Sequence, residues 1–141
     1  DIKKNKNLSY KYLPLKKLMS ECDVISLHLH YNKNTFKILN KNLLSKMKKN
    51  SILVNVSRAG LVDNKYLNIM LKKKKIFGAG LDVFDKEPTQ KGDLFLDLDN
   101  VVLTPHTAGS TLDTYLEVID NCYNNIILAS KSKKIKWLIK K

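Results

Sequence analysis

The sequence has few cysteines, few prolines and no long apolar run. Its two cysteines, Cys22 and Cys122, lie in no Cys/His cluster, which excludes a disulfide framework and a zinc site. We therefore expect no metal and a reducing, cytoplasmic setting. No apolar run exceeds five residues, too short to span a bilayer, so we expect no membrane partner. The 43% of hydrophobic residues, with only five glycines and three prolines, argue against a disordered or fibrous chain.

Arginine is nearly absent too. Of the 26 basic residues, only Arg58 is arginine, and the formal net charge is +13. Such an excess suggests nucleic acid or a membrane surface as a partner. A nucleic-acid-binding protein typically carries arginine interleaved with aromatic residues, or a recognisable binding module, and neither is present. We interpret the charge as mostly solvated lysine and expect no specific nucleic-acid partner.

Short apolar segments alternate along the chain with segments of helical spacing. The apolar, β-branched segments predict buried strands at residues 23–28, 51–56, 78–84 and 101–104. Helical spacing predicts helices at residues 13–19, 42–48, 64–73 and 110–129. We expect Pro14 in a first turn, Asn50 in the left-handed conformation after the second helix, and Asp63 as an N-cap.

This alternation predicts an α/β fold. Strand–helix–strand units of this length form parallel sheets, with helices expected on both faces. The glycines of the third strand, Gly78 and Gly80, are expected to let neighbouring backbones approach closely. No internal repeat or Pro-, Gly- or Ser-rich linker interrupts the pattern. Polar residues cluster where the predicted strands end, at the edge where open α/β sheets bind ligands.

Three residues at these strand ends stand out by their chemistry. A chain with 25 lysines keeps its single arginine, Arg58, where a planar guanidinium can bind a carboxylate at two points; a structural salt bridge is the alternative. Glu87 and His106 follow neighbouring strands, which would bring them to one edge. There the carboxylate can orient the imidazole for proton transfer. The three residues together predict a site for an anionic oxo-acid.

Four ordered segments resemble the D-isomer-specific 2-hydroxyacid dehydrogenases, namely SECDVISLHLHYNKNTF, MKKNSILVNVSRAGLVDNKYL, FGAGLDVFDKEP and NVVLTPHTAGST. The resemblance covers residues 1–126. It implies a partial Rossmann-type, doubly wound parallel sheet, which corresponds to the second half of the NAD-binding domain. It also implies an oxidoreductase in which hydride passes between NADH and a small 2-oxo-acid.

The same resemblance implies roles for individual residues. Arg58 matches the arginine that binds and polarises the oxo-acid, and His106 matches the acid/base that protonates its carbonyl. Glu87 matches the carboxylate that pairs with this histidine. Asp82 matches the residue that holds the nicotinamide carboxamide.

Further positions match residues that line the cofactor in this family. Besides Arg58 and His106, they are Leu29, His30, Val56 and Ser57. Asp1 lies near the acid that binds the adenosine ribose and selects NAD over NADP. His30 stands where relatives usually have proline, and we expect this change to alter the loop beside the cofactor.

The motif G-x-G-x-x-G is absent, because none of the five glycines has that spacing. In this family the motif lets a pyrophosphate approach a helix N-terminus. We therefore expect a fragment that lacks the first strand and its turn. Residues 1–126 would be a partial NAD-binding domain, and residues 127–141 a basic segment leading toward a substrate domain outside the chain. We expect the isolated chain to be inactive and the full-length enzyme to be a homodimer.

Two other functions remain open at this point. The same fold can serve a non-catalytic regulatory or interaction protein. Alternatively, the chain is a basic module whose last residues, 131–141, contact nucleic acid or anionic lipid. Packing of the apolar residues 137–139 against another domain explains that segment equally well.

Overall fold

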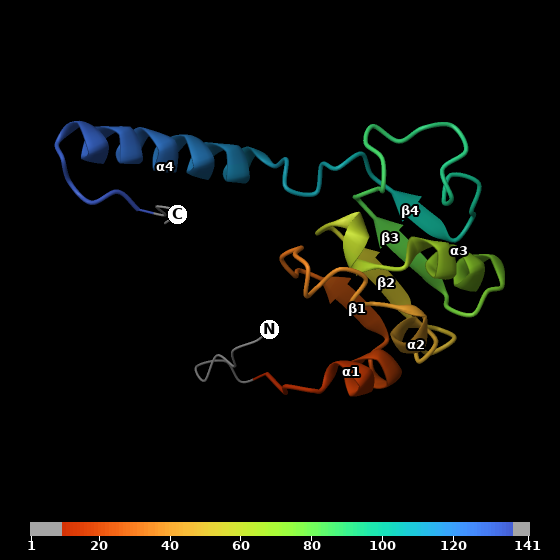
Figure 1. Cartoon of the computed structure of the whole chain (residues 1–141). Helices are drawn as coiled ribbons and strands as arrows, with labels where there is room; N and C mark the ends of the chain where they lie inside the picture. Colours follow the sequence, from red (N-terminus) through yellow and green to blue (C-terminus); the bar gives the residue numbers. More distant parts are fainter. Residues whose placement is uncertain (1–9, 137–141) are drawn as a thin grey trace. The chain divides into compact units, whose positions relative to one another are not determined.

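The chain forms two compact units, Asp1–His106 and Thr107–Lys141, and the computed structural model describes residues 10–136. The elements of the first unit are α1 (Leu15–Glu21), β1 (Val24–Leu27), α2 (Lys41–Leu44), β2 (Ile52–Asn55), the 3-10 helix η1 (Ala59–Leu61), α3 (Asn64–Lys72), β3 (Gly78–Leu81) and β4 (Val101–Leu103) (Figure 1). The second unit contains α4 (Leu112–Ser130).

The four strands form one parallel sheet in the order β1-β2-β3-β4. Val24 pairs with Ile52, Ile52 with Gly78, and Ala79 with Val101, so the strands run in close register. Short β-branched segments joined by helical connections form such parallel sheets. The predicted α/β class and parallel topology are confirmed.

Side-chain caps fix where the helices begin. Asn40 caps α2 by accepting hydrogen bonds from the amides of Asn42 and Leu43. Asp63 caps α3 through the Tyr66 amide, as the sequence predicts, and Thr111 caps α4 through the Thr114 amide. Each cap satisfies amides that have no partner within the helix.

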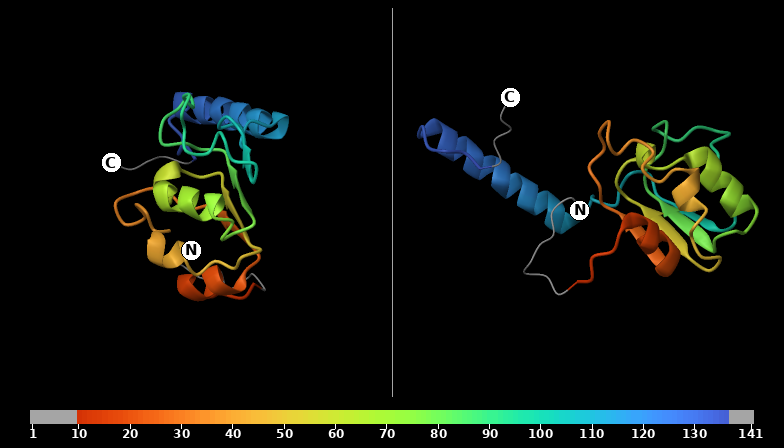
Figure 2. Two further views of the ribbon diagram at one scale, coloured as in Figure 1. Left: turned by 90° about the vertical axis from the view of Figure 1, so that its right-hand side faces the viewer. Right: turned by 60° about the horizontal axis from the view of Figure 1, so that its bottom comes forward.

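One face of the sheet carries the hydrophobic core. Met19 of α1, Leu44 of α2 and Leu67 of α3 pack in the same cluster as Leu53 and Leu81 from the strands. All five side chains are almost fully buried. Because α1, α2 and α3 contribute to this single cluster, they cover the same face of the sheet (Figures 1 and 2).

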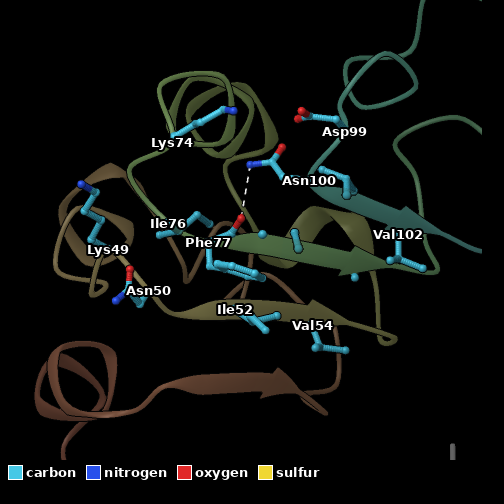
Figure 3. A pocket seen from close by; sticks show the side chains of 14 residues that line it. Lys49, Asn50, Ile52, Val54, Lys74, Ile76, Phe77, Asp99, Asn100 and Val102 are labelled. Carbon is cyan, nitrogen blue, oxygen red and sulfur yellow. Dashed lines mark hydrogen bonds between the residues drawn. The ribbon is translucent and has the colours of Figure 1, made fainter.

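The opposite face differs from the expectation of helices on both sides. Within residues 10–106 no helix covers it, and Val24, Phe77 and Val102 are 59%, 67% and 71% exposed. Ile52 and Val54 line a hollow of about 620 Å³ on the same face (Figure 3). The strands are therefore apolar on both faces, although the described part of this unit buries only one.

Two local predictions need correction. The observed helix is shorter than the predicted helix 42–48, because α2 ends at Leu44 and a turn follows. Asn50 does not take the left-handed conformation; among the described non-glycine residues, Lys37, Lys74, His106 and Ser132 do. The chain instead leaves the turn through Ser51, whose amide and hydroxyl both donate to the Lys48 carbonyl.

The division between the two units falls after His106, and α4 runs without a break through residue 126. The domain boundary that the sequence suggests at residue 126 stays a prediction. In the described part of the chain, no helix combines the length and the apolar character needed to cross a bilayer.

Candidate active site

Polar side chains follow β2, β3 and β4 at the carboxyl edge of the sheet. Arg58 comes three residues after the end of β2, Asp82 directly after β3, and His106 three residues after β4. In a parallel sheet these strand ends lie along one edge, where open α/β sheets bind their ligands. The sequence-based placement of the candidate site is therefore consistent with the observed topology.

His106 and Glu87 are in direct contact. The His106 Nδ1 atom lies 2.7 Å from Glu87 Oε2. An ionised carboxylate can only accept, so Nδ1 carries the proton in this contact. Nε2 is then the atom through which His106 can exchange a proton with a ligand.

The hydrogen bond from His106 lowers the pKa of the Glu87 carboxyl below its usual value, and the amide of Phe84, which donates to Glu87 Oε1 at 3.0 Å, adds to this effect. The positive charge of Arg58 contributes in the same direction. Glu87 therefore stays ionised near neutral pH and remains a fixed hydrogen-bond acceptor for the imidazole.

His106 also has an unusual backbone. Its φ angle is 55°, in the left-handed region that residues with a Cβ seldom adopt. The His106 amide donates to the Thr104 carbonyl at 3.0 Å, which stabilises this tight turn after Pro105. Strained backbone of this kind is found preferentially at functional sites. No pattern in the sequence predicts this backbone conformation.

Arg58 is exposed at the same edge. Its Nη1 atom donates to the Ser57 carbonyl at 2.6 Å, and Arg58 makes no ion pair with any of residues 10–136. The structural salt bridge considered from the sequence is thus not found in this part of the chain. The positive charge of Arg58 is the smallest of the causes that lower the pKa of the Glu87 carboxyl.

A hollow of about 380 Å³ opens beside Arg58, between the loops that follow β1 and β2. It is lined by His28, Leu29, His30, Tyr31, Ser57 and Arg58. Ser57 ties the two loops together, because its hydroxyl donates to the Leu29 carbonyl at 2.6 Å. The structure therefore brings Leu29, His30 and Ser57 together with Arg58, and Val56 connects β2 to this loop.

Asp82 is buried, with 2% of its surface exposed. Its Oδ1 atom accepts a hydrogen bond of 2.6 Å from the Thr104 hydroxyl, and its amide donates to the Asn55 carbonyl at 3.0 Å. A buried carboxylate held in this way can offer hydrogen-bond acceptors at the sheet edge. Asp1, also predicted to contact the cofactor, lies outside the described residues.

Sequence reasoning missed two residues that support this edge. Asn55 is buried within β2, and Thr104 directly precedes Pro105 and His106. A signal for Asn55 was present: it is a lone polar residue at a core position of an otherwise apolar strand. Within the described residues, no three His, Cys, Asp or Glu side chains gather closely enough to hold a metal ion.

Comparison with known proteins decides the family. The model of the D-isomer specific 2-hydroxyacid dehydrogenase, NAD binding domain, matches residues 1–108. The chain belongs to this dehydrogenase family. Its parallel sheet is accordingly a part of the Rossmann-type NAD-binding domain of a D-2-hydroxyacid dehydrogenase, as the four sequence segments predict.

Individual relatives agree with this assignment. The chain is 42% identical over 122 residues to a glyoxylate reductase of Korarchaeum cryptofilum, covering 86% of the chain and 37% of that protein. It is 38% identical over 136 residues to a glyoxylate reductase of Pyrococcus furiosus, covering 96% of the chain and 40% of that protein. D-lactate dehydrogenase of Lactobacillus jensenii, solved with NAD+, superposes with a TM-score of 0.91 at 26% identity, covering 100% of the chain and 47% of that protein.

The chain thus spans less than half the length of each of these three proteins.

Proposed function

We propose that this chain forms the catalytic edge of an NAD-dependent oxidoreductase that reduces a small 2-oxo-acid to the 2-hydroxy-acid. The observation that carries the proposal is the His106–Glu87 contact of 2.7 Å, with the charge of Arg58 acting on the same carboxylate. An acid/base pair beside an arginine suits a substrate that has both a carboxylate and a carbonyl.

In this proposal each of the three residues has one task. The exposed Arg58 guanidinium binds the substrate carboxylate with two parallel hydrogen bonds and draws electron density from the neighbouring carbonyl. His106 transfers the proton on Nε2 to the carbonyl oxygen. The Glu87 carboxylate keeps the proton on Nδ1 and stabilises the positive charge of the imidazolium before that transfer.

The hollow beside Arg58 fits the nicotinamide end of the cofactor. It lies at the carboxyl edge of a parallel sheet, where nucleotide cofactors bind. Leu29, His30, Val56 and Ser57 would line the cofactor, together with Arg58 and His106, and the buried Asp82 would accept hydrogen bonds from the carboxamide. When bound, NADH supplies the hydride for the carbonyl carbon. The role proposed for Asp1 is to bind the adenosine ribose.

The substrate we propose is a compact oxo-acid such as glyoxylate. This rests on the glyoxylate reductases to which the chain is 42% and 38% identical. We further propose that the protein acts in the cytoplasm, as its two unpaired cysteines suggest, and that the full-length enzyme is a homodimer without a nucleic-acid partner.

Oxamate, a planar, non-reducible analogue of a 2-oxo-acid, tests the proposal on the chain itself. Because Arg58 is the single arginine, the ¹⁵N spectrum contains one arginine Nε signal, which needs no further assignment. We expect oxamate to shift this signal in a saturable manner, as a bidentate carboxylate contact would.

An Arg58→Lys variant should lose the response to oxamate, since an ammonium group cannot make the two-point contact; its binding is followed by the His106 ring signals. Lys65→Gln, which removes a charge from the exposed side of α3, serves as the control and should bind like the parent chain. Absence of any oxamate-dependent shift in the parent chain would refute the proposed preformed carboxylate site at Arg58.

A further inference from the structure

Asn55 has a polar side chain at a core position of β2, where an apolar side chain is expected. It ends β2 on the face that packs against the core, and only 1% of its surface is exposed. Leu53, two residues earlier on the same face, is completely buried among apolar side chains. A buried amide costs folding free energy unless both its donor and its acceptor are satisfied.

Both ends of the Asn55 amide are used by the loop that carries Arg58. The Asn55 Nδ2 group donates to the Arg58 carbonyl at 3.0 Å. The Asn55 Oδ1 atom accepts from the Ser57 amide at 3.1 Å. A single buried side chain therefore fixes the backbone on both sides of the peptide that joins Ser57 to Arg58.

The backbone of Asn55 extends this link to the next strand. Its carbonyl accepts from the Asp82 amide at 3.0 Å. Asp82 in turn accepts from the Thr104 hydroxyl, and the Thr104 carbonyl accepts from the His106 amide. A continuous series of hydrogen bonds thus runs along the sheet edge from the Arg58 loop to His106.

From this arrangement we propose that Asn55 is a positioning residue for Arg58: its buried amide sets the direction in which the guanidinium leaves the sheet edge. This inference deepens the proposed function and rests on it. Asparagine suits the task because it combines one acceptor and one donor in a short, planar group. Aspartate keeps the shape but loses the donor, and it places a negative charge against the Arg58 carbonyl.

The Asn55 contacts matter for the alignment of the Arg58 guanidinium with the carboxylate of a ligand. A two-point contact between guanidinium and carboxylate tolerates little misplacement, since both hydrogen bonds must be nearly linear. A loop held on both sides of one peptide restricts Arg58 before the ligand arrives, so that less conformational entropy is lost on binding. Loss of the Asn55 contacts should therefore weaken ligand binding without removing Arg58 itself.

The experiment compares Asn55→Asp with the matched variant Asn100→Asp in the 141-residue chain. Asn100 also donates through Nδ2 to backbone carbonyls, those of Leu71 and Phe77, but it precedes β4 at the opposite edge of the sheet. Asn55→Ala, which adds no charge, is the second variant at the site. For each protein, thermal unfolding, the ¹⁵N relaxation of the single arginine Nε and the affinity for oxamate are measured.

We expect Asn55→Asp and Asn55→Ala to increase the mobility of the Arg58 Nε group and to weaken oxamate binding about tenfold. Asn100→Asp should lower the unfolding temperature while leaving both Arg58 readouts at the parental values. The inference is overturned if a folded Asn55 variant keeps the parental Arg58 relaxation, or if Asn100→Asp changes it equally.

The ¹⁵N relaxation of the Arg58 Nε group tests the role of Asn55 even without a ligand. A parent chain that does not bind oxamate, but whose Arg58 loses order in the Asn55 variants, would refute the proposed carboxylate site at Arg58 and retain the positioning contact. Parental oxamate binding in a folded Asn55→Ala chain would instead refute the inference and leave the proposed function intact.

Discussion

At the scale of single residues, Glu87 and His106 form a pair in which each side chain sets the state of the other. Both are partly exposed, at 37% and 44% of their side-chain surface, so solvent screening keeps the energy of the contact small. Its value for the site is geometric instead. The carboxylate fixes the tautomer and the ring orientation of the imidazole, which a solvated histidine would not maintain.

The pKa of the Glu87 carboxyl gives a direct measure of this pair. The hydrogen bond from His106 is the main cause of its lowered pKa, followed by the bond from the Phe84 amide. The pKa of Glu87 is lower in the folded chain than in the unfolded chain, so the contact stabilises the fold at pH values above the pKa of the unfolded chain. That stabilisation is lost as the pH falls through the pKa of the folded chain.

We therefore predict that His106→Ala raises the pKa of Glu87 toward its usual value, as measured by ¹³C titration of the side-chain carboxyl group. His28→Ala is the matched control, because it removes another exposed histidine that does not touch Glu87. An unchanged Glu87 titration in the His106 variant would contradict the account, as would an equal shift in the His28 variant.

Much of the site could be predicted at this scale from residue chemistry and spacing. Glu87 lies nineteen positions before His106, a spacing that suggested neighbouring strand ends, and the two side chains do meet. The left-handed backbone of His106 could not be predicted, because it depends on how the turn after β4 closes onto Thr104. The catalytic and cofactor roles of these residues stay predictions.

At the scale of elements, β3 owes its place in the sheet to a missing side chain. A Cβ at Gly78 would lie 2.6 Å from the Asn100 carbonyl oxygen, a backbone atom that cannot move without disturbing the approach to β4. A Cβ at Gly80 would meet only the Val54 methyl groups, at 3.9 Å. The expected close approach of backbones therefore applies to Gly78 and not to Gly80.

This difference predicts opposite outcomes for the same substitution on one strand. Gly78→Ala should lower the free energy of unfolding by about 1–3 kcal/mol, the usual cost of overpacking. Gly80→Ala should change it by less than about 1 kcal/mol and can stabilise the chain, since alanine restricts the unfolded state.

Denaturant unfolding of the two glycine variants, monitored by circular dichroism, measures both free energies. Equal losses would show that the contact between Gly78 and Asn100 does not determine the packing of β3 against β4.

The sequence predicted the order and type of the elements well, because β-branched runs and helical spacing are local signals. The predicted strands are each longer than those observed; after β3, for example, Val83 is still apolar and buried although strand pairing ends at Leu81. The early end of α2 had no local signal. After Leu44 the chain continues in tighter turns, in which the Lys46 and Met47 amides donate to the Leu43 and Leu44 carbonyls.

At the scale of the whole molecule, the sheet of the first unit is apolar on both faces, while α1, α2 and α3 cover one. The apolar strands predict helices on both faces, because strands of this kind are usually covered on both sides. Strand composition reveals that a face is apolar, but it does not reveal which segment of a protein covers it. The pyrophosphate-binding turn is a similar case. This chain has no G-x-G-x-x-G, and its sequence does not reveal which segment of a protein provides that turn.

We propose that Arg58, Glu87 and His106 together form a working catalytic edge for 2-oxo-acid reduction. A chimera tests this proposal: this chain replaces the matching segment of the Pyrococcus furiosus glyoxylate reductase, with which it aligns over 136 residues. The rest of the enzyme is then supplied by the relative, and glyoxylate-dependent NADH oxidation is followed by absorbance.

We predict that the chimera reduces glyoxylate. His106→Gln should lower kcat by about 10²–10⁴-fold, as expected for loss of a general acid. Arg58→Lys should lower kcat/KM by about tenfold or more, and Lys65→Gln should have no effect. A folded chimera that binds NADH but does not reduce glyoxylate, or one whose His106→Gln variant keeps the parental rate, would show that these three residues do not form a catalytic edge.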